Sequence, residues 1–258
     1  MSYFKYAFLA CAVLFVACGD DSSTSASDTP KEPAKDSPSE STDVVANYLN
    51  PDYSYGEVTD TRDGQAYKTT TIGSQTWLAQ NMNYESVNSA CYDNVADSCS
   101  KHGRLYTWND AKLACPSGWH LPDTTEWYAL LAEVGGMDSA AVNLISKNGW
   151  PRTANASASM DSIVSQIDTA LTSNVPKGWG GSDPYGFSAL PAGSGMDNGG
   201  FIGVGGFTEF WLATEYLVNS FGESVDEAYY GNLLILDYYA HTVAAGKTRL
   251  KSVRCVKD

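Results

Sequence analysis

The sequence has few of the residues, and none of the short motifs, on which several common enzyme families depend. Its 258 residues include only three histidines. The H-E-x-x-H pattern of zinc peptidases and the G-x-S-x-G elbow of serine hydrolases do not occur. A glycine-rich stretch begins at Gly193 but has Asn198 where a dinucleotide-binding fingerprint needs glycine. These families are excluded, and the glycines are interpreted as turn residues.

Basic residues are also scarce. The 16 Lys and Arg residues stand against 30 Asp and Glu residues, a formal net charge of −14. Because a surface this acidic repels phosphate backbones, we expect no nucleic-acid partner. Solubility explains the charge, and cation binding is the alternative. Hydrophobic residues make up 43% of the chain and aromatic residues 12%, which suits one core in a loop-rich domain that contains strands.

Long apolar runs are absent except at residues 6–16, which are too few to span a bilayer. Lys5 precedes this run, and Phe15, Val16 and Ala17 lead into Cys18 in the order of a degenerate lipobox. We therefore predict a lipoprotein signal peptide at residues 1–18, with Cys18 acylated as a membrane anchor. Cleavage as an ordinary signal peptide is the alternative.

Residues 19–55 are rich in Ser, Asp, Pro and Lys and show no apolar periodicity, so we predict a flexible tether. Asp20 and Asp21 resemble the surface-export signal of some Gram-negative lipoproteins, with plain solvated tether as the alternative. The expected location is the outer membrane or cell surface. The folded domain is expected to occupy residues 56–258.

Helix signals cluster in residues 103–133. Trp108 begins a short apolar-faced helix that Pro116 stops. Asp123 and Glu126 have the spacing of a capping box, so a second helix is predicted to begin there and to end at the following glycine pair. A third helix is expected over residues 138–147.

Strand signals flank these helices. Alternating residues 67–71 and the return at 75–79 predict a hairpin. Further strands are expected at residues 207–216, within 227–239 and at 251–256. Residues 151–182 look like an insertion that carries a helix-like run at 161–171.

A series of phrases in this ordered part resembles the Fibrobacter succinogenes major paralogous domain. These phrases are Asp60-Thr-Arg-Asp-Gly-Gln-x-Tyr67-Lys-Thr, Trp77-Leu-Ala-Gln-Asn-Met-Asn-Tyr84, Gly103-Arg-Leu-Tyr-Thr-Trp108, Cys115-Pro-Ser-Gly-Trp-His-Leu-Pro122, Gly186-Phe-Ser-Ala-Leu-Pro-Ala-Gly193, Phe210-Trp-Leu-Ala-Thr-Glu215 and Ser252-Val-Arg-Cys255-Val.

The helical run also resembles the helical half of C-type lectin-like domains, through Trp108-x-x-Ala111-x-x-x-Cys115 and Gly118-x-His120-Leu121. His120-Leu121-Pro122 with Glu126-Trp127 is similar to a signature of formylglycine-generating domains, which share that fold. The resemblance implies an α+β, C-type lectin-like fold with short antiparallel sheets, two or three helices, many loops and stapling disulfides. It implies a cellular setting but no established activity.

Four cysteines lie outside the leader, and they allow three connectivities. The C-type lectin-like resemblance implies a whole-domain disulfide, Cys115–Cys255, which leaves Cys91–Cys99 across a short acidic loop. A zinc site is the alternative, although no C-x-x-C pair exists. Formylglycine-generating enzymes oxidise cysteine through cysteine ligands. The cysteines here do not match that catalytic pair, so we expect no enzyme.

Loop aromatics and carboxylates are the candidate ligand-binding residues, because aromatic rings stack on sugar faces and carboxylates bind hydroxyls or cations. We select Trp179, Tyr185, Asp183, Asp197 and Glu215. Asp226 and Glu227 join the three carboxylates as candidate calcium ligands, with scattered surface acids as the alternative. Further aromatics expected to expose a ring are Trp150 and one residue each of Tyr229-Tyr230 and Tyr238-Tyr239, with core packing as the alternative.

Two other motifs favour structural roles. His120 lies between apolar neighbours and is expected to be packed and hydrogen-bonded. The Trp108-Asn109-Asp110 triplet, which some calcium-dependent lectins use in a late strand, here opens a helix.

The sequence thus predicts a lipid-anchored, extracytoplasmic, non-catalytic binding or adhesion module for a polysaccharide or a surface partner. It requires no cofactor beyond the calcium alternative. A second hypothesis is a structural envelope protein that binds another protein. A third is an oxidoreductase like the formylglycine-generating enzymes.

Overall fold

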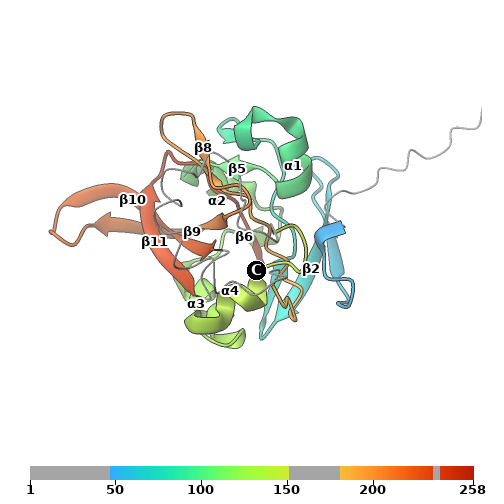
Figure 1. Cartoon of the computed structure of the whole chain (residues 1–258). Helices are drawn as coiled ribbons and strands as arrows, with labels where there is room; N and C mark the ends of the chain where they lie inside the picture. Colours follow the sequence, from blue (N-terminus) through green and yellow to red (C-terminus); the bar gives the residue numbers. More distant parts are fainter. Residues whose placement is uncertain (1–46, 151–180, 235–238) are drawn as a thin grey trace, which may run out of the picture. The chain divides into compact units, whose positions relative to one another are not determined.

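A computed structural model describes residues 47–150, 181–234 and 239–258. These residues form a mixed α+β domain in which helices pack against antiparallel sheets (Figure 1). The predicted α+β class and short antiparallel sheets are therefore confirmed. The signal segment at residues 1–18, the tether as far as residue 46 and the helix-like run at 161–171 lie outside the described residues.

A five-stranded antiparallel sheet joins the two ends of the domain. Its order is β1 (Gly56–Thr59), β2 (Ala66–Ile72), β3 (Gln75–Leu78), β12 (Val256–Lys257) and β6 (Trp119–His120). β2 and β3 form the predicted hairpin, in which Ile72 pairs with Gln75. Gly73 between them has a φ of +59°, which favours glycine in a tight hairpin turn.

A three-stranded antiparallel sheet contains β9 (Phe207–Val218), β10 (Ser224–Leu234) and β11 (Ala240–Gly246), with β10 in the middle. β11 was not predicted. β11 pairs with β10 only as far as Glu227, whereas β9 continues to the Val218–Ser224 pair. The two-stranded extension, residues 215–226, is called the arm below; it projects at the left of Figure 1.

The described residues contain four α-helices: α1 (Ala96–His102), α2 (Trp108–Ala114), α3 (Thr124–Glu133) and α4 (Met137–Leu144). The predicted capping box of α3 is confirmed, since the Asp123 carboxylate accepts the Glu126 N–H at 2.8 Å and the reverse bond is 2.9 Å. The expectation of two or three helices was too low because α1 lies in the segment predicted as a polar loop. α4 also ends before the predicted residue 147, since Ile145 is extended and bridges to Ala189.

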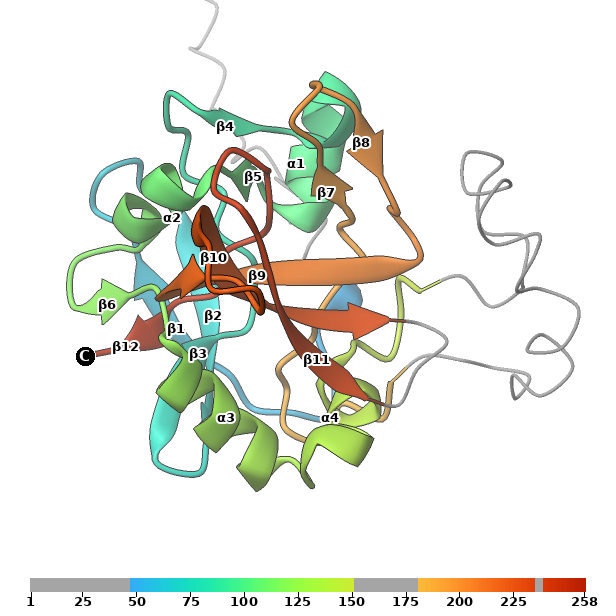
Figure 2. The ribbon, with the colours of Figure 1, turned by 90° about the vertical axis from the view of Figure 1, so that its left-hand side faces the viewer.

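Two short strand pairs complete the described fold. β4 (Ser89–Ala90) pairs with β5 (Leu105–Tyr106), and β7 (Ser194–Gly195) pairs with β8 (Phe201–Ile202). A 3-10 turn at Tyr92–Asn94 precedes α1. In Figure 2 these pairs lie near α1, at the opposite end of the domain from α3 and α4.

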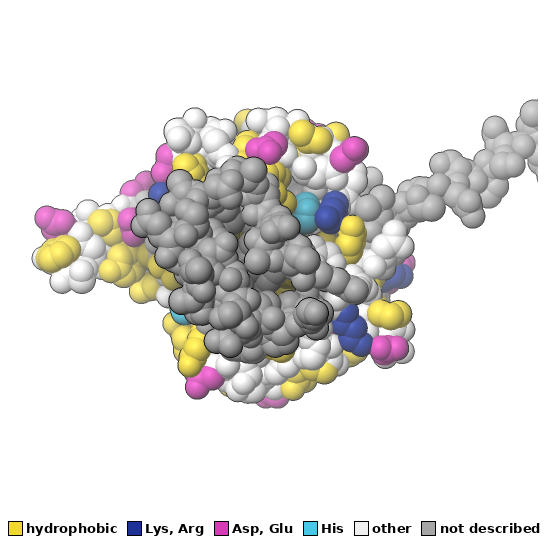
Figure 3. All heavy atoms as spheres, in the orientation of Figure 1, with side chains coloured by type: hydrophobic (Ala, Val, Ile, Leu, Met, Phe, Trp, Pro, Cys, Tyr) yellow, Lys and Arg dark blue, Asp and Glu magenta, His cyan; other side chains and the backbone are white. Residues whose placement is uncertain are grey.

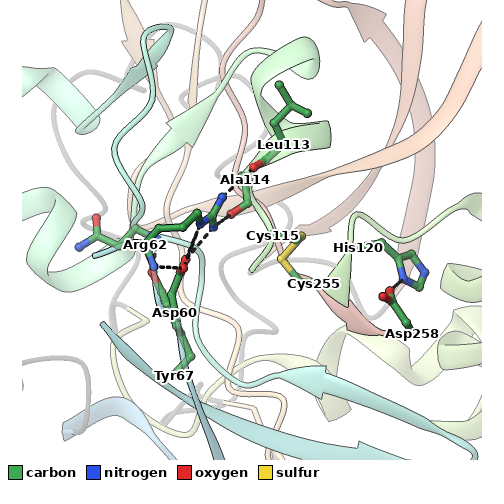
Figure 4. Close-up of a disulfide and its surroundings, with 10 residues drawn as sticks. Asp60, Arg62, Tyr67, Leu113, Ala114, Cys115, His120, Cys255 and Asp258 are labelled. Atoms are coloured by element: carbon green, nitrogen blue, oxygen red, sulfur yellow. Dashed lines mark hydrogen bonds and ion pairs between the residues drawn. A yellow bond between two sulfur atoms is a disulfide. The ribbon is translucent and has the colours of Figure 1, made fainter. Parts of the chain in front are cut away.

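Two disulfides staple the domain and confirm both implied pairings. Cys115–Cys255 joins the end of α2 to the residue before β12, 140 positions away (Figure 4). Cys91–Cys99 closes a loop of only eight positions. On a chain-entropy estimate, the long link stabilises the fold by about 5 kcal/mol and the short one by about 2–3 kcal/mol.

The core is rich in aromatic rings, which contact one another and, at one position, the backbone of a strand. Trp127 of α3 packs on β10 at Gly231, where an added Cβ would lie 2.3 Å from the indole. Phe187 stands edge-on to both Trp77 and Phe210, with ring centroids 5.9 and 6.0 Å apart. A glycine at 231 is therefore required for the helix to seat on the sheet.

One arginine is entirely inside this core. Arg254 is 1% exposed and donates from Nε to the Asn81 side chain at 2.6 Å. Its remaining nitrogens donate to three backbone carbonyls, those of Leu78, Phe187 and Ser188. Burial lowers the pKa of Arg254 to about 9, so it stays charged at neutral pH. The guanidinium thus ties the end of β3 to the 187–188 segment.

The ordered domain begins earlier than residue 56. Asn50 is buried and its side chain donates to the Asp183 carbonyl at 2.7 Å. The Tyr55 and Ser188 hydroxyls lie 3.0 Å apart, and the Tyr53 hydroxyl accepts from Thr70 at 2.8 Å. In the part of the chain that is described, no helix is long and apolar enough to cross a membrane.

Candidate binding groove

Two adjoining hollows share Tyr84 and Glu85 as a common wall. The larger, about 680 Å³, lies between the turn before β2, the segment before β4 and α2. The smaller, about 370 Å³, lies beside the Cys91–Cys99 disulfide. We call their union the Tyr84 groove. Its lining is Arg62, Asp63, Gln65, Asn83, Tyr84, Glu85, Ser86, Val87, Ser89, Cys91, Ala96, Cys99, Arg104, Asp110 and Leu113.

Arg62 fixes one wall of the groove. Its guanidinium makes three hydrogen bonds to the buried Asp60 carboxylate, of 2.9, 3.1 and 2.6 Å. It also donates to the carbonyls of Leu113 and Ala114 at the end of α2, where the helix dipole favours a cation (Figure 4). The same group lies 3.9 Å from the centroid of the Tyr84 ring. Five hydrogen bonds to three acceptor groups thereby hold the guanidinium against the Tyr84 ring.

Asp110 fixes the opposite wall. Its carboxylate accepts the Ser86 hydroxyl at 2.8 Å and the Asn88 N–H at 2.7 Å. Burial raises the pKa of Asp110, but these hydrogen bonds outweigh burial and lower the pKa below its ordinary value. The group is therefore a carboxylate at neutral pH. It holds the segment that carries Val87, whose side chain is almost fully exposed.

The floor of the smaller hollow carries amides and an ion pair. Gln65 and Asn83 hydrogen-bond through their side chains at 3.2 Å, and the Arg104 guanidinium pairs with Glu85 at 3.0 Å. The Asn83 Oδ1 atom is buried and has no hydrogen-bond partner among the described residues. The groove thus combines amides, carboxylates, guanidinium groups and one phenol ring, the groups that bind sugar hydroxyls and sugar faces.

A third hollow, about 580 Å³, lies over His120. The Nε2 atom of this ring is 2.8 Å from Glu126, and the Nδ1 atom is 2.6 Å from the Asp258 carboxylate (Figure 4). Burial lowers the pKa of His120, but the two carboxylates outweigh burial and raise its pKa. Both ring nitrogens are hydrogen-bonded, as expected, but the side chain is 41% exposed, so the expectation that His120 is packed was wrong.

The ligand residues selected from the sequence do not come together. Asp183 is fully buried and accepts the Ser188 N–H at 2.9 Å and the Ser188 hydroxyl at 2.7 Å, while burial raises its pKa to about 6. Tyr185 packs partly buried against the core. Asp197 binds Thr248 and Arg249 on the surface. Trp179 lies outside the described residues.

The remaining carboxylates are arranged around a lysine. The carboxylates of Glu215 and Asp226 both form ion pairs with Lys247, at 2.9 and 2.7 Å. Glu227 lies in β10, where it stands opposite Gly246 of β11. Among the described residues, no three His, Cys, Asp or Glu side chains gather as metal ligands. Glu215 and Asp226 thus share one lysine, whereas Asp183 lies in the interior and Asp197 binds Thr248 elsewhere on the surface.

The aromatic predictions had mixed outcomes. Trp150 is buried and its indole donates to the Ala189 carbonyl at 2.9 Å, so its predicted exposure was wrong. Tyr229 and Tyr230 are both half-buried, on opposite faces of β10. Tyr239 is 48% exposed, whereas Tyr238 lies outside the described residues.

Comparison with known protein families identifies the chain. The Fibrobacter succinogenes major domain model matches residues 70–257. The chain belongs to this family. No curated protein and no solved structure matches it significantly. The two disulfides within the family domain are consistent with an extracytoplasmic location.

Several residues of the sequence motifs that this Fibrobacter succinogenes major domain shares with its family are buried in the interior. Asn81 and Arg254 come from two of them and bond to each other, and Phe187 from a third stacks on the same guanidinium, 4.6 Å away. Trp211 from a fourth donates to the Tyr106 carbonyl at 2.8 Å. The phrases therefore predict the fold better than they predict a ligand.

Sequence reasoning did not identify the Tyr84 groove. Arg62 and Tyr84 are far from Asp110 in sequence, and only the folded chain joins them. Arg62 did stand in a recognised phrase next to turn residues, and Asp110 stood in the Trp108-Asn109-Asp110 triplet. The signals in the sequence that could have indicated the groove were therefore an arginine in a turn and an acidic residue in a short helix.

Proposed function

We propose that this chain is a lipid-anchored, extracytoplasmic binding module without catalytic function, and that it holds a polysaccharide chain in the Tyr84 groove. The observation that carries the proposal is the pair of adjoining hollows, which share a fixed tyrosine and contain polar groups of both hydrogen-bonding types. A groove that joins two hollows and combines polar side chains with one aromatic wall suits a chain of sugar rings better than a small apolar ligand.

The groove is prepared before a ligand arrives. Arg62 and Asp110 are each held by several hydrogen bonds, so binding does not have to order them. Glu85 is largely exposed, whereas the Arg104 side chain that pairs with it is only 16% exposed, so Glu85 is the partner that can turn to receive hydroxyl groups. Val87 and Leu113 add exposed apolar contacts at the rim.

The non-catalytic part of the proposal rests on how the reactive side chains are used. All four described cysteines form disulfides, so they provide no thiol for the chemistry of the formylglycine-generating enzymes. Both nitrogens of His120 are held by carboxylates. A thiol titration of the unreduced mature domain tests this point, and a reactive thiol within residues 56–258 would contradict it.

A C-type lectin-like fold is part of the same proposal. Its support is the succession of α2 and α3 and the long disulfide that links α2 to the last strand. The insertion of β12 between β3 and β6 also places both ends of the domain in one sheet. Superposition of a crystal structure on C-type lectin-like domains tests this assignment, and a different strand order would overturn it.

The anchor is tested separately. The proposal places an acyl chain on Cys18, so Cys18→Ser is expected to release the protein from the membrane fraction into the soluble fraction. The unchanged chain is the control. Equal membrane retention of both chains would contradict the anchor and leave the groove untouched.

Binding assays with soluble xylan, mixed-linkage glucan and amorphous cellulose test the groove. Tyr84→Ala is expected to weaken binding at least about fivefold, because an aromatic contact of about 1 kcal/mol is lost. Leu113→Glu, at an exposed rim position, is expected to weaken binding without altering the core. Tyr128→Ala is the control, since Tyr128 is an exposed tyrosine on α3, which lines neither hollow, and unfolding midpoints check that the loss of the partly buried Tyr84 ring leaves the domain folded.

Two outcomes would contradict the groove proposal. One is that none of these polysaccharides binds to the unchanged chain. The other is that Tyr84→Ala and Leu113→Glu bind as well as Tyr128→Ala, whereas Trp179→Ala does not bind. The second result would return the ligand site to the aromatic residue selected from the sequence.

A further inference from the structure

The arm presents a cluster of apolar side chains that the domain itself does not cover. Leu217 and Val218 are each more than half exposed, and Phe221 at the tip is 87% exposed. Tyr216 and Tyr229 stand edge to face at the base of this cluster, with ring centroids 5.3 Å apart. Figure 3 shows apolar atoms along the projecting arm. Leu217 and Val218 are successive strand residues, so they face opposite sides of the arm, and Phe221 stands at the tip between these two faces. Single exposed apolar residues are common, but an exposed phenylalanine at the tip of a projection with an apolar residue on each face indicates a contact surface.

The turn at the tip holds Phe221 in place. The Asn219 side-chain oxygen accepts the N–H groups of Phe221 and Glu223, at 3.0 and 2.9 Å. The Asn219 amide also donates to the Glu223 carboxylate at 3.0 Å, and Gly222 has a φ of +81°, which favours glycine. One asparagine therefore organises the whole turn. An exposed phenylalanine on an ordered turn resembles the preorganised anchor residues of protein interfaces.

The arm also leaves backbone groups available at its edges. β11 ends opposite Glu227, and beyond it the Asp226 carbonyl accepts the Lys247 N–H at 3.4 Å, so Ser224 and Val225 of β10 are left without a strand on that side among the described residues. The outer edge of β9 bonds to neighbouring segments at Trp211 and Ala213, but no such backbone bond occurs from Glu215 to Val218 in the described part. A partner can therefore add main-chain hydrogen bonds to either edge.

The charges around the cluster distinguish among possible occupants. Four carboxylates flank the apolar residues: Glu215, Glu223, Asp226 and Glu227. Lys247 pairs with two of them, Glu215 and Asp226. Two arms from two copies would bring these acidic edges together, in a chain of net charge −14. An anionic lipid surface is disfavoured for the same reason. A basic protein surface is complementary.

We infer that the arm is a protein-docking element, and that its partner is a protein with an apolar pocket for Phe221 and lysine or arginine residues at the rim of that pocket. Phe221 is the anchor, Leu217 and Val218 extend the apolar contact along the two opposite faces of the arm, so that the arm inserts into the pocket, and the carboxylates select the basic rim. This surface is distinct from the Tyr84 groove, so the inference does not depend on polysaccharide binding.

Site-specific photocrosslinking in cells of the source organism tests the inference. A benzoylphenylalanine replaces Phe221 in the full chain, and a second chain carries it at Tyr128 as a matched exposed aromatic position. We expect one protein product that forms from position 221 and not from position 128. The crosslinked peptide of that protein is expected to carry lysine or arginine residues.

The captured protein is then purified and its binding to the unmodified chain is measured. Phe221→Ser is expected to weaken binding at least tenfold, Tyr128→Ser to change it less than twofold, and Glu223→Lys with Glu227→Lys to weaken it further. Raising the salt concentration is expected to slow association. Unchanged unfolding midpoints of the variants show that the domain remains folded.

Four results would overturn the inference. They are products common to both positions, no product from position 221, a product that is a second copy of this chain, and Phe221-dependent binding to vesicles of phosphatidylethanolamine and phosphatidylglycerol. The last would assign the arm to a lipid surface. A captured protein whose affinity for Phe221→Ser is unchanged also counts against it.

Discussion

Strand β9 has a buried half and an exposed half, and the two halves differ in what holds them. Phe210, Trp211 and Leu212 in the first half are each at most 1% exposed. Leu217 and Val218 in the second half are more than half exposed, although their residue types are equally apolar. Hydrophobicity along the strand therefore does not distinguish interior from surface. What distinguishes the two halves is whether neighbouring elements of the fold cover them.

The buried half is covered by groups that come from far along the chain. Arg254 lies 5.5 Å from the Phe210 ring centroid, and Lys251 lies over the Tyr230 ring at 3.8 Å while it pairs with the buried Glu209. In the arm, Lys247 pairs with Glu215 and Asp226, but among the described residues no group covers Leu217, Val218 or Phe221, which stay more than half exposed. The recognised phrase Phe210-Trp-Leu-Ala-Thr-Glu215 ends where the covering ends. This phrase thus belongs to the scaffold and the exposed part of the arm lies beyond it, whereas the Tyr84 groove takes Arg62, Tyr84 and Arg104 from other phrases.

The largest expected effect is at the centre of the buried half. Arg254→Met removes the donors for the Asn81 side chain and three carbonyls, all of them buried. Each unpaired polar group costs about 1–3 kcal/mol, so a loss of at least about 5 kcal/mol, or failure to fold, is expected. Urea unfolding measures it. Arg254→Lys is the control, which keeps the charge but cannot reach all four acceptors. A loss below about 1 kcal/mol for Arg254→Met would contradict the role of this residue.

A smaller effect concerns pH. Burial raises the pKa of Asp183 to about 6, above its ordinary value of 3.8. The folded domain therefore binds this proton more tightly than the unfolded chain does. The stabilisation is complete below about pH 3.8 and is lost as the pH rises through about 6. Relative to Asp183→Asn, the unchanged chain is expected to lose about 2 kcal/mol of unfolding free energy between pH 4 and pH 7.

Asparagine is a suitable comparison at this position. Its amide oxygen can accept the Ser188 N–H, and its amide nitrogen can donate to the Ser188 hydroxyl, so the two observed contacts are retained without charge. Urea unfolding of both chains at several pH values isolates the contribution of Asp183 protonation to the free energy of unfolding. Parallel pH profiles would mean that Asp183 does not titrate in this range.

Local signals in the sequence predicted most of the scaffold. The capping box of Asp123 and Glu126, the hairpin turn at Gly73 and the helix stop at Pro116 each depend on residues a few positions apart. The disulfide Cys115–Cys255 came from the resemblance to a family, because spacing alone left three pairings open. α1 was missed because its polar sequence lacks an apolar stripe, and the Cys91–Cys99 link constrains it.

The candidate sites could not be predicted in the same way. Asp183 was selected as a ligand because it lies in a glycine-rich loop, but Asn50 and Ser188 bury it inside. The Tyr84 groove depends on the contact of Arg62 with the end of α2, about 50 positions away. The arm depends on where β11 stops. Each of these facts is long-range, and composition does not encode it.

The smallest expected effect is at the exposed half of β9, and it tests the comparison along a single strand. Phe221→Ser together with Leu217→Thr is expected to change the free energy of unfolding by less than about 0.5 kcal/mol, because both side chains are largely solvated in the folded domain. Phe210→Ala in the same strand is expected to lose about 3–5 kcal/mol, because it leaves a cavity under Arg254 and beside Phe187. Urea unfolding at one pH measures all three chains. A large loss in the arm variant would mean that the arm is part of the core after all, and its apolar residues would then need no partner.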